Sequence, residues 1–188
     1  MRARLAGLLF LGLLPTACTT PPPPYTVSMP GLSVAFGGDI DVWAINIAQW
    51  AFADSSRIAD RPVEAARAAA ALEYLAVALN APRWADMNPI TKMEMVTARF
   101  ELRLALGIPP DAPSQPVIQS LLDCANALAA GDPIAAAAIL RSPLFGFGPD
   151  RTLAILNTLP FLRAANIATM HAGANETGAG GRGGVVWR

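Results

Sequence analysis

Histidine and cysteine are scarce in this chain of 188 residues, and each shortage excludes a class of protein. His171 is the only histidine, so a metal site that needs two histidine ligands cannot form. The two cysteines, Cys18 and Cys124, are too few for the disulfide framework of small exported domains. We therefore expect no metal ion, no other cofactor and a fold that depends on packing.

The chain also lacks an excess of charge of either sign. It has 14 basic and 14 acidic side chains, and its formal net charge is zero. A protein that binds the phosphate backbone of a nucleic acid normally carries a basic patch and a positive balance. We therefore expect no nucleic-acid partner.

No apolar run in the sequence is long enough to cross a membrane as a helix. The run Leu5–Leu14 has ten apolar or small residues, which span about 15 Å as a helix against a hydrocarbon core of about 30 Å. Arg2 and Arg4 precede the run, and small residues follow it. This order is typical of a secretory signal peptide, which we predict for residues 1–17.

Pro15-Thr16-Ala17-Cys18 resembles the lipobox of bacterial lipoproteins, in which a small residue precedes the cysteine that becomes the lipid-bearing N-terminus. The resemblance implies cleavage after Ala17 and diacylation of Cys18. Two acyl chains are enough to hold a protein stably at a membrane. Thr19 stands where an aspartate would mark inner-membrane retention, so the outer membrane is favoured, with the domain facing the periplasm. Conventional cleavage, which would give a soluble periplasmic or secreted protein, is the alternative.

Residues 18–38 are predicted to link the lipid to the folded domain. Pro21–Pro24 favour an extended left-handed helix of about 3.1 Å per residue, which would serve as a stalk. The following sequence TVSMPGLSVAFGG, residues 26–38, contains glycine, proline and a short β-branched alternation. We expect extended chain there, with one short strand as an alternative.

Proline and capping residues predict an all-α domain over residues 39–173. Proline favours the first turn of a helix, because its missing N–H group would have no intrahelical partner there. Pro160 is expected to kink or split the last helix. Since strands and helices do not alternate, we expect an irregular bundle of about six or seven helices. The predicted helix starts are Asp39 or Asp41, Pro62, Pro89, Pro116, Pro133 and Pro149.

Apolar residues recur at intervals of three and four along two of these helices, as a buried helix face requires. Each of the two helices has two such faces, and the first helix is apolar enough on most sides to be expected at the centre of the core. In the first helix they are Ile40, Trp43, Ile47 and Trp50, and beside them Ile45, Ala48 and Phe52. In the helix that begins at Pro89 they are Met93, Val96, Phe100 and Leu104, and Met95, Ala98, Leu102 and Leu106.

The segment ANALAAGDPIAAAAIL, Ala125–Leu140, resembles the helix–turn–helix step of a tetratricopeptide repeat, where small residues let two helices approach closely. A similar Pro-aliphatic string begins at Pro62, about two repeat lengths before Pro133. The resemblance implies stacked helical hairpins. The rest of the pattern favours the irregular bundle.

The single histidine and the acidic residues offer few catalytic arrangements. A pair of Cys124 and His171 is disfavoured, because Cys124 lies in apolar company and His171 lies near a glycine-rich end. We expect a buried thiol and a solvated imidazole at a helix end. Glu94 and Glu101 are seven residues apart, which is too far for the two carboxylates of a glycosidase. They are expected on a solvated polar edge.

Three further acidic residues receive structural interpretations. Glu73 lies among small residues, and we expect it at an exposed edge rather than in a buried ion pair with Arg67 or Arg99. Asp39 and Asp41 follow two glycines but lack the further spaced oxygen ligands of a calcium loop. Capping of the first helix is the better interpretation.

Aromatic residues supply the candidate ligand pocket. Trp43, Asn46, Trp50, Phe52 and Phe100 would line a cavity between helices, with the amide supplying hydrogen bonds. Aromatic residues at helical spacing are more often part of a core, and this is the interpretation that the sequence favours.

The glycine-rich segment 174–188 is predicted to be a flexible tail. The leader and the lack of a catalytic constellation together predict a non-enzymatic, membrane-anchored lipoprotein of the cell envelope. Its helical surface would bind another envelope protein. The alternative is a periplasmic carrier that holds a small apolar molecule or a lipid in a cavity between helices.

Overall fold

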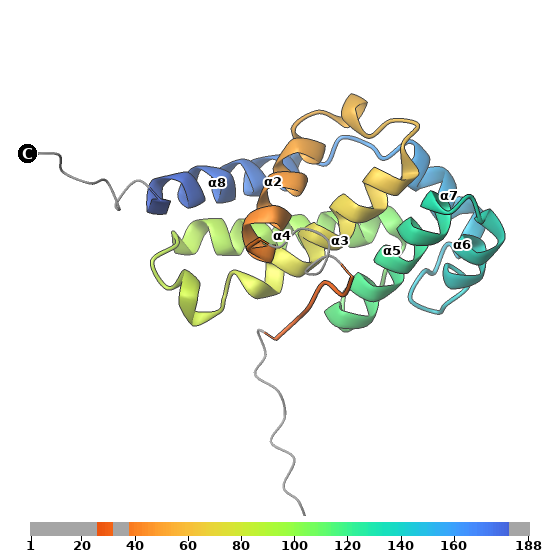
Figure 1. Ribbon diagram of the computed structural model, residues 1–188, viewed down its shortest axis with the longest axis horizontal. Coiled ribbons are helices and arrows are strands. Elements are labelled where there is room, and N and C mark those ends of the chain that lie inside the picture. Colours follow the sequence, from red (N-terminus) through yellow and green to blue (C-terminus); the bar gives the residue numbers. More distant parts are fainter. Residues whose placement is uncertain (1–25, 32–37, 181–188) are drawn as a thin grey trace, which may run out of the picture.

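The structure is a computed structural model that describes residues 26–31 and 38–180 (Figure 1). All regular elements in this part of the chain are helical, which confirms the predicted all-α bundle. Two short 3-10 helices, η1 (Ser55–Arg57) and η2 (Pro82–Trp84), lie in the connections. The α-helices are α2 (Ile40–Ala53), α3 (Pro62–Ala78), α4 (Pro89–Leu106), α5 (Ser114–Ala129), α6 (Pro133–Ile139), α7 (Gly148–Asn157) and α8 (Arg163–Gly180).

Local capping interactions fix several helix ends where the sequence predicts them. At the start of α4, Asn88 accepts a hydrogen bond from the Ile90 N–H at 2.9 Å. Gly107 ends α4 with a φ of 69°, a left-handed conformation that glycine adopts without strain. At the start of α6, Asp132 accepts a hydrogen bond from the Ala135 N–H at 2.8 Å. These interactions involve neighbours in sequence, so sequence alone is enough to locate them.

The last predicted helix is divided, as expected from Pro160. The connection that contains this proline separates α7 from α8. However, α8 continues to Gly180, although we expected the helical domain to end at residue 173 and a flexible tail to begin at 174. The start of that segment is therefore helical, and residues 181–188 lie outside the described residues.

Four helices form a ring in which each helix packs against two others. α2 packs against α3 and α8, and α4 packs against the same two helices. α5 covers the outer side of α3, α6 packs against α5, and α7 contacts α3, α4 and α6 (Figure 1). α3 is thus the central helix of an irregular bundle.

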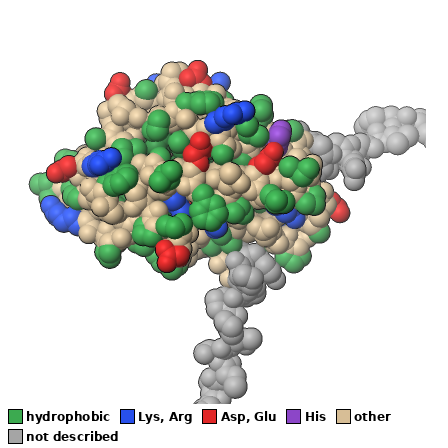
Figure 2. Space-filling view, turned by 180° about the vertical axis from the view of Figure 1, so that it is seen from behind, with side chains coloured by type: hydrophobic (Ala, Val, Ile, Leu, Met, Phe, Trp, Pro, Cys, Tyr) green, Lys and Arg blue, Asp and Glu red, His purple; other side chains and the backbone are tan. Residues whose placement is uncertain are grey.

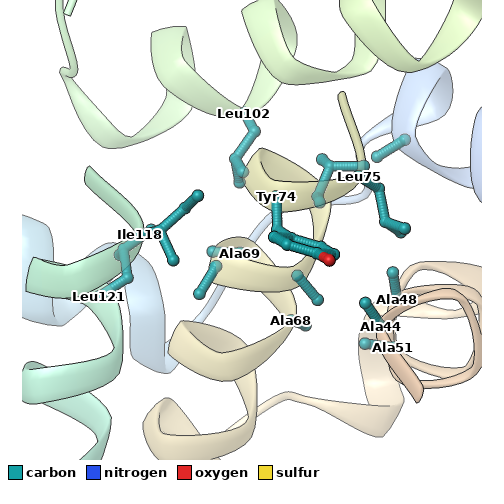
Figure 3. Close-up of a cluster of buried hydrophobic side chains, with 14 of the residues drawn as sticks. Ala44, Ala48, Ala51, Ala68, Ala69, Tyr74, Leu75, Leu102, Ile118 and Leu121 are labelled. Carbon is teal, nitrogen blue, oxygen red and sulfur yellow. The ribbon is translucent and has the colours of Figure 1, made fainter. Parts of the chain in front are cut away.

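Small side chains let the neighbouring helices approach α3 closely. The distance between packed helices depends on the side chains at their contact, and alanine permits the shorter distances. Figure 3 shows Ala68 of α3 on the side of the α2 alanines and Ala69 of α3 on the side of Ile118 and Leu121 of α5. The labelled residues are Ala44, Ala48 and Ala51 of α2, Ala68, Ala69, Tyr74 and Leu75 of α3, Leu102 of α4, and Ile118 and Leu121 of α5.

The first helix buries one of its two predicted faces completely. Ile45, Ala48 and Phe52 of α2 belong to the core. On the second face, Trp50 is exposed, and the other three residues are only partly buried against the core. These three are Ile40, Trp43 and Ile47.

The described part of the lead-in, residues 26–31, docks on α5 and contains no strand. The Ser28 N–H donates to the Gln115 side chain at 2.7 Å, and the Gln115 amide donates back to the Ser28 carbonyl at 3.1 Å. Met29 beside them is buried. The chain therefore joins the domain at the first turn of α5.

The segment 125–140 forms a helix, a turn and a second helix, as its resemblance to a tetratricopeptide step implies. α5 ends at Ala129, Gly131 adopts a φ of 73° in the turn, and α6 follows. α6 has only seven residues. The local hairpin is present, while the surrounding helices follow the ring arrangement.

Candidate functional site

Four large apolar side chains lie exposed along the outer side of α4. Ile90 is 62% exposed, Met93 70%, Phe100 45% and Leu104 78%. Their spacing, with Thr97 in the middle, places them on one face of the helix. We call these five residues the α4 stripe. Three of its members, Met93, Phe100 and Leu104, belong to one of the two apolar faces predicted for this helix, and they are exposed.

The opposite side of α4 explains why the α4 stripe points outward. The second predicted apolar face is buried, and its residues are Met95, Ala98, Leu102 and Leu106. A helix at the edge of a bundle buries only one of its faces against the domain. Because α4 has two faces of similar apolar content, one of them remains in solvent. The face with alanine at its centre packs against the domain, and the bulkier face is left in solvent.

Glu94 holds one edge of α4 to the neighbouring helix α8. Its carboxylate lies 2.6 Å from Nδ1 of His171, and the imidazole is exposed. Figure 2 shows the face of the molecule that carries His171, the single purple side chain, with an acidic side chain against it and apolar side chains spread around it. His171 is not at a helix end as predicted, because α8 continues beyond it.

Glu101 caps α8 from the side. Its Oε2 atom accepts hydrogen bonds from the backbone N–H groups of Ala164 (2.8 Å) and Ala165 (3.1 Å), in the first turn of α8. These N–H groups have no intrahelical partner, and a carboxylate there also favours the positive end of the helix dipole. Glu94 and Glu101 therefore join α4 to α8, whereas we expected a merely solvated edge.

The other edge of α4 carries a buried ion pair. Arg103 is 2% exposed and Glu73 of α3 is 0% exposed. Arg103 donates to Glu73 through Nε at 3.0 Å and also through Nη2, and it donates to the Pro110 carbonyl through Nη1 at 2.7 Å. The Ser114 hydroxyl completes the group by donating to Glu73 at 2.7 Å. The pair connects α3, α4, α5 and the α4–α5 connection.

The position of Glu73 corrects the sequence prediction. We expected it at an exposed edge, with Arg67 or Arg99 as its partner if it were buried. It is buried, and its partner is Arg103. Arg103 is thirty residues away in sequence, so only the packing of α4 on α3 brings the two charges together.

Arg99 lies between this buried group and the α4 stripe. Its guanidinium is 5.4 Å from the centre of the Phe100 ring, within the range of a cation–π contact. Its Nη1 atom is 3.4 Å from the Ser114 hydroxyl. Burial lowers the pKa of Arg99, an effect partly offset by the negative charge of Glu73. Arg99 thus covers one side of Phe100 and leaves the rest of the ring exposed.

Asp41 is a second buried carboxylate, which the sequence reasoning assigned only to helix capping. Asp39 does cap α2, by accepting from the Asp41 N–H at 3.0 Å. The Asp41 side chain is buried and accepts hydrogen bonds from the Tyr74 hydroxyl and from the Trp84 indole N–H at 2.7 Å. Arg83 lies 3.2 Å from it and also pairs with Asp39.

The electrostatics of this group follow from burial and from close partners. The hydrogen bond from Arg83 holds the pKa of Asp39 below its usual value. Burial, followed by the hydrogen bond to Asp41, raises the pKa of Tyr74. The tyrosine therefore stays protonated and donates to the carboxylate, which fixes η2 and α3 against the start of α2. The sequence signal was the presence of Asp41 one position inside an apolar helix.

The residues predicted to line a ligand pocket lie apart. Phe52 is buried in the core, and Trp43 is partly buried against it. Asn46 and Trp50 are exposed on the outer side of α2. Phe100 is exposed on α4, which is across the ring from α2. The five side chains therefore do not line one cavity.

Cys124 is a buried thiol, as predicted, and burial raises its pKa to about 11. It lies on α5, whereas His171 lies on α8 and contacts Glu94. Within residues 26–31 and 38–180, no three histidine, cysteine, aspartate or glutamate side chains are grouped as metal ligands would be. Four of the nine large apolar side chains that are exposed in the described part of the chain lie in the α4 stripe.

Several predicted features lie outside the described residues. They are the signal peptide, its cleavage point at Ala17, the lipid site at Cys18 and the proline stalk. None of the helices in the described part combines the length and the hydropathy that crossing a bilayer demands.

No protein-family model, no curated protein and no solved structure matches the chain.

Proposed function

We propose that this protein is a non-enzymatic lipoprotein of the bacterial cell envelope. In this proposal a lipid on Cys18 anchors the chain to the outer membrane, and the helical domain faces the periplasm. The α4 stripe is the surface through which the domain binds another envelope protein. The observation that carries the binding role is the row of exposed apolar side chains on a helix whose other face is well packed.

The chemistry of the α4 stripe supports a protein partner. Scattered single apolar residues are normal on a surface, but several large apolar side chains along one helix face are typical of an interaction site. Ile90, Met93, Phe100 and Leu104 follow the spacing with which one helix presents its side chains to a groove or to a second helix. The same side chains, if left in water, would be a liability for aggregation.

The structural roles of four carboxylates support a non-enzymatic role. Glu73 and Asp41 are buried and satisfied by structural partners. Glu94 and Glu101 are engaged with α8. An acid–base catalyst needs a carboxylate within reach of a substrate, and these four groups hold helices together instead.

The anchor is tested by replacing the cysteine that would carry the lipid. Cys18→Ser removes the acceptor sulfur, so we expect the protein to move from the membrane pellet to the soluble fraction. Cys124→Ala is the matched control, because it removes the other thiol and should leave the protein in the membrane pellet. Retention of the Cys18→Ser chain in membranes would disprove the lipid anchor.

The binding surface is tested separately, with the anchor intact. A photo-activated crosslinking residue at position 104 should join the chain to a protein partner in living cells. Phe100→Glu should abolish that product, because a charge on the α4 stripe must then be buried. Ile134→Glu on α6, where the side chain is 80% exposed, is the control and should leave it unchanged. If Phe100→Glu leaves the crosslinked product unchanged, the α4 stripe is not the surface that binds the partner.

A further inference from the structure

The α4 stripe has nearly the same composition on both sides of Thr97. Ile90 and Leu104 lie seven residues before and after Thr97, and Met93 and Phe100 lie four before and three after. A two-fold dimer contact uses the same patch on both subunits, so the patch must be complementary to itself. Apolar side chains at equal or nearly equal distances on both sides of Thr97 meet this requirement.

We infer that the partner of the α4 stripe is a second copy of this chain. The α4 helices of the two copies lie along each other and are closest at their Thr97 residues. The inference rests on the proposed function, because it names the partner of the same surface. The residues of the α4 stripe alternate at spacings of three and four. This spacing is typical of two helices that pack with the side chains of one helix inserted between those of the other.

The absence of charge within the α4 stripe favours a second copy over a partner selected by charge. None of its five residues is ionisable, and two acidic neighbours, Glu94 and Glu101, are turned to His171 and to the first turn of α8. Two copies can therefore meet without bringing unpaired carboxylates together. An uncharged seam offers little to a strongly charged partner, because long-range complementarity comes from opposite charges.

A lipid surface fits the α4 stripe less well than a second helix does. Helices that lie on membranes carry several basic residues beside their apolar face. The basic residues of α4 are Lys92, Arg99 and Arg103, and Arg103 is consumed by the buried pair with Glu73. Arg99 is held against Phe100 and is partly buried. Lys92 alone would not supply the attraction.

The size of the contact predicts a weak dimer. α4 has 18 residues, which corresponds to about 27 Å of helix. One helix pair of this length lies at the lower end of specific protein interfaces. Two chains anchored in one membrane meet at a much higher effective concentration than two free chains. The dimer should therefore form in the membrane more readily than in dilute solution.

Disulfide trapping in native membranes tests the inference directly. A disulfide needs the two Cα atoms within about 7 Å, so Thr97→Cys should give a disulfide-linked product of twice the chain mass after mild oxidation. The unaltered chain controls for Cys18 and the buried Cys124. Ser56→Cys, exposed on η1, controls for random collision. Both controls should remain monomeric.

Charge substitutions in the Thr97→Cys chain then test the surface. Phe100→Glu should lower the trapped dimer at least tenfold, because each copy would then bury a carboxylate against Met93 and the other apolar side chains of the second copy. Ile134→Glu should leave the trapped dimer unchanged. Circular dichroism of each variant checks that the domain remains folded, which is expected because both replaced side chains are exposed.

Three results would overturn the inference. These are a Thr97→Cys chain that stays monomeric, a dimer that survives Phe100→Glu, and a mixed disulfide with a different protein. The last result would leave the proposed function standing and would identify its partner. The lipid anchor is tested separately, by the fractionation of the Cys18→Ser chain. A failure of the anchor is therefore distinguished from a failure of the dimer.

Discussion

Glu73 is the residue in which burial and charge conflict most strongly. It is fully buried, but Arg103 and the Ser114 hydroxyl satisfy its carboxylate. A buried ion pair of this kind often adds little net stability compared with apolar residues of the same size. Loss of one member is costly, because the other remains buried without a partner. The pair therefore selects one arrangement of α3, α4 and α5.

Replacing Glu73 by alanine should destabilise the domain by about 3–5 kcal/mol, the range for breaking a buried ion pair. Urea unfolding followed by circular dichroism measures the change. Asp111→Ala, an exposed carboxylate in the α4–α5 connection, is the control and should cost less than about 0.5 kcal/mol. The double variant Glu73→Leu, Arg103→Met should recover most of the loss. A cost for Glu73→Ala no greater than that of the control would contradict the role of the pair.

Two buried hydroxyl groups should respond in opposite ways to removal. Tyr74→Phe deletes a donor to buried Asp41 and should cost about 1–3 kcal/mol. The hydroxyl of Thr152 in α7 is buried and has no hydrogen-bond partner in the described part of the chain. Thr152→Val should therefore be neutral or stabilise by up to about 1 kcal/mol. Urea unfolding measures the change in stability of both variants. Equal losses of stability would show that the hydrogen bonding of the two hydroxyl groups does not determine the effect of removing them.

At the scale of elements, α4 and α8 form an antiparallel pair with matched contacts. Glu94 near the start of α4 contacts His171, and Glu101 further along contacts Ala164 at the start of α8. Thr91 accepts a hydrogen bond from Asn175 at 3.3 Å, which continues the same register. These polar contacts run along one edge of the α4 stripe and fix the helix that carries it.

Gly107, at the C-terminal end of α4, should not tolerate a side chain. Its φ is 69°, and a Cβ atom there would lie 2.6 Å from the Phe147 ring. Gly131 has a similar φ of 73° but open space around it. Gly131→Ala should cost about 1–2 kcal/mol for backbone strain. Gly107→Ala should cost about 1–3 kcal/mol more, because the ring must move.

The midpoint of thermal unfolding measures this comparison. Gly107→Ala should unfold at the lowest temperature of the three proteins, and Gly131→Ala should fall between it and the unaltered chain. Equal midpoints for the two variants would show that the Phe147 ring does not constrain the connection.

Helix ends were predictable from the sequence because capping is local. Asn88, Asp132 and Gly107 each act on residues within one turn. The break at Pro160 is equally local, since proline cannot continue the hydrogen-bonded ladder. These residues therefore gave the fold class and the approximate boundaries of most helices.

The candidate site could not be predicted in the same way. α4 carries two apolar faces, and sequence does not state which one packs, because that depends on the shapes of α3 and α8. The exposed position of Phe100 and Leu104 follows from that choice. The partners of Glu73 and Asp41 also come from other helices, far away in sequence. Long-range packing decides all of these features.

At the scale of the whole molecule, the leader is a prediction from the sequence, whereas the domain is described by the structure. Residues 26–31 dock on α5 through Ser28 and Gln115, so the chain enters the domain at a fixed place. The α4 stripe lies on a different helix. In the proposed function, the segment before residue 26 leads to the membrane and the α4 stripe binds the partner, which we infer to be a second copy.

Mass spectrometry of the protein isolated from membranes tests the central claim most directly. The account predicts an N-terminal peptide that begins at Cys18 and carries the added mass of its acyl chains. It also predicts that residues 1–17 are missing from the mature chain. A peptide that still contains Met1, together with an unmodified thiol at Cys18, would contradict the account.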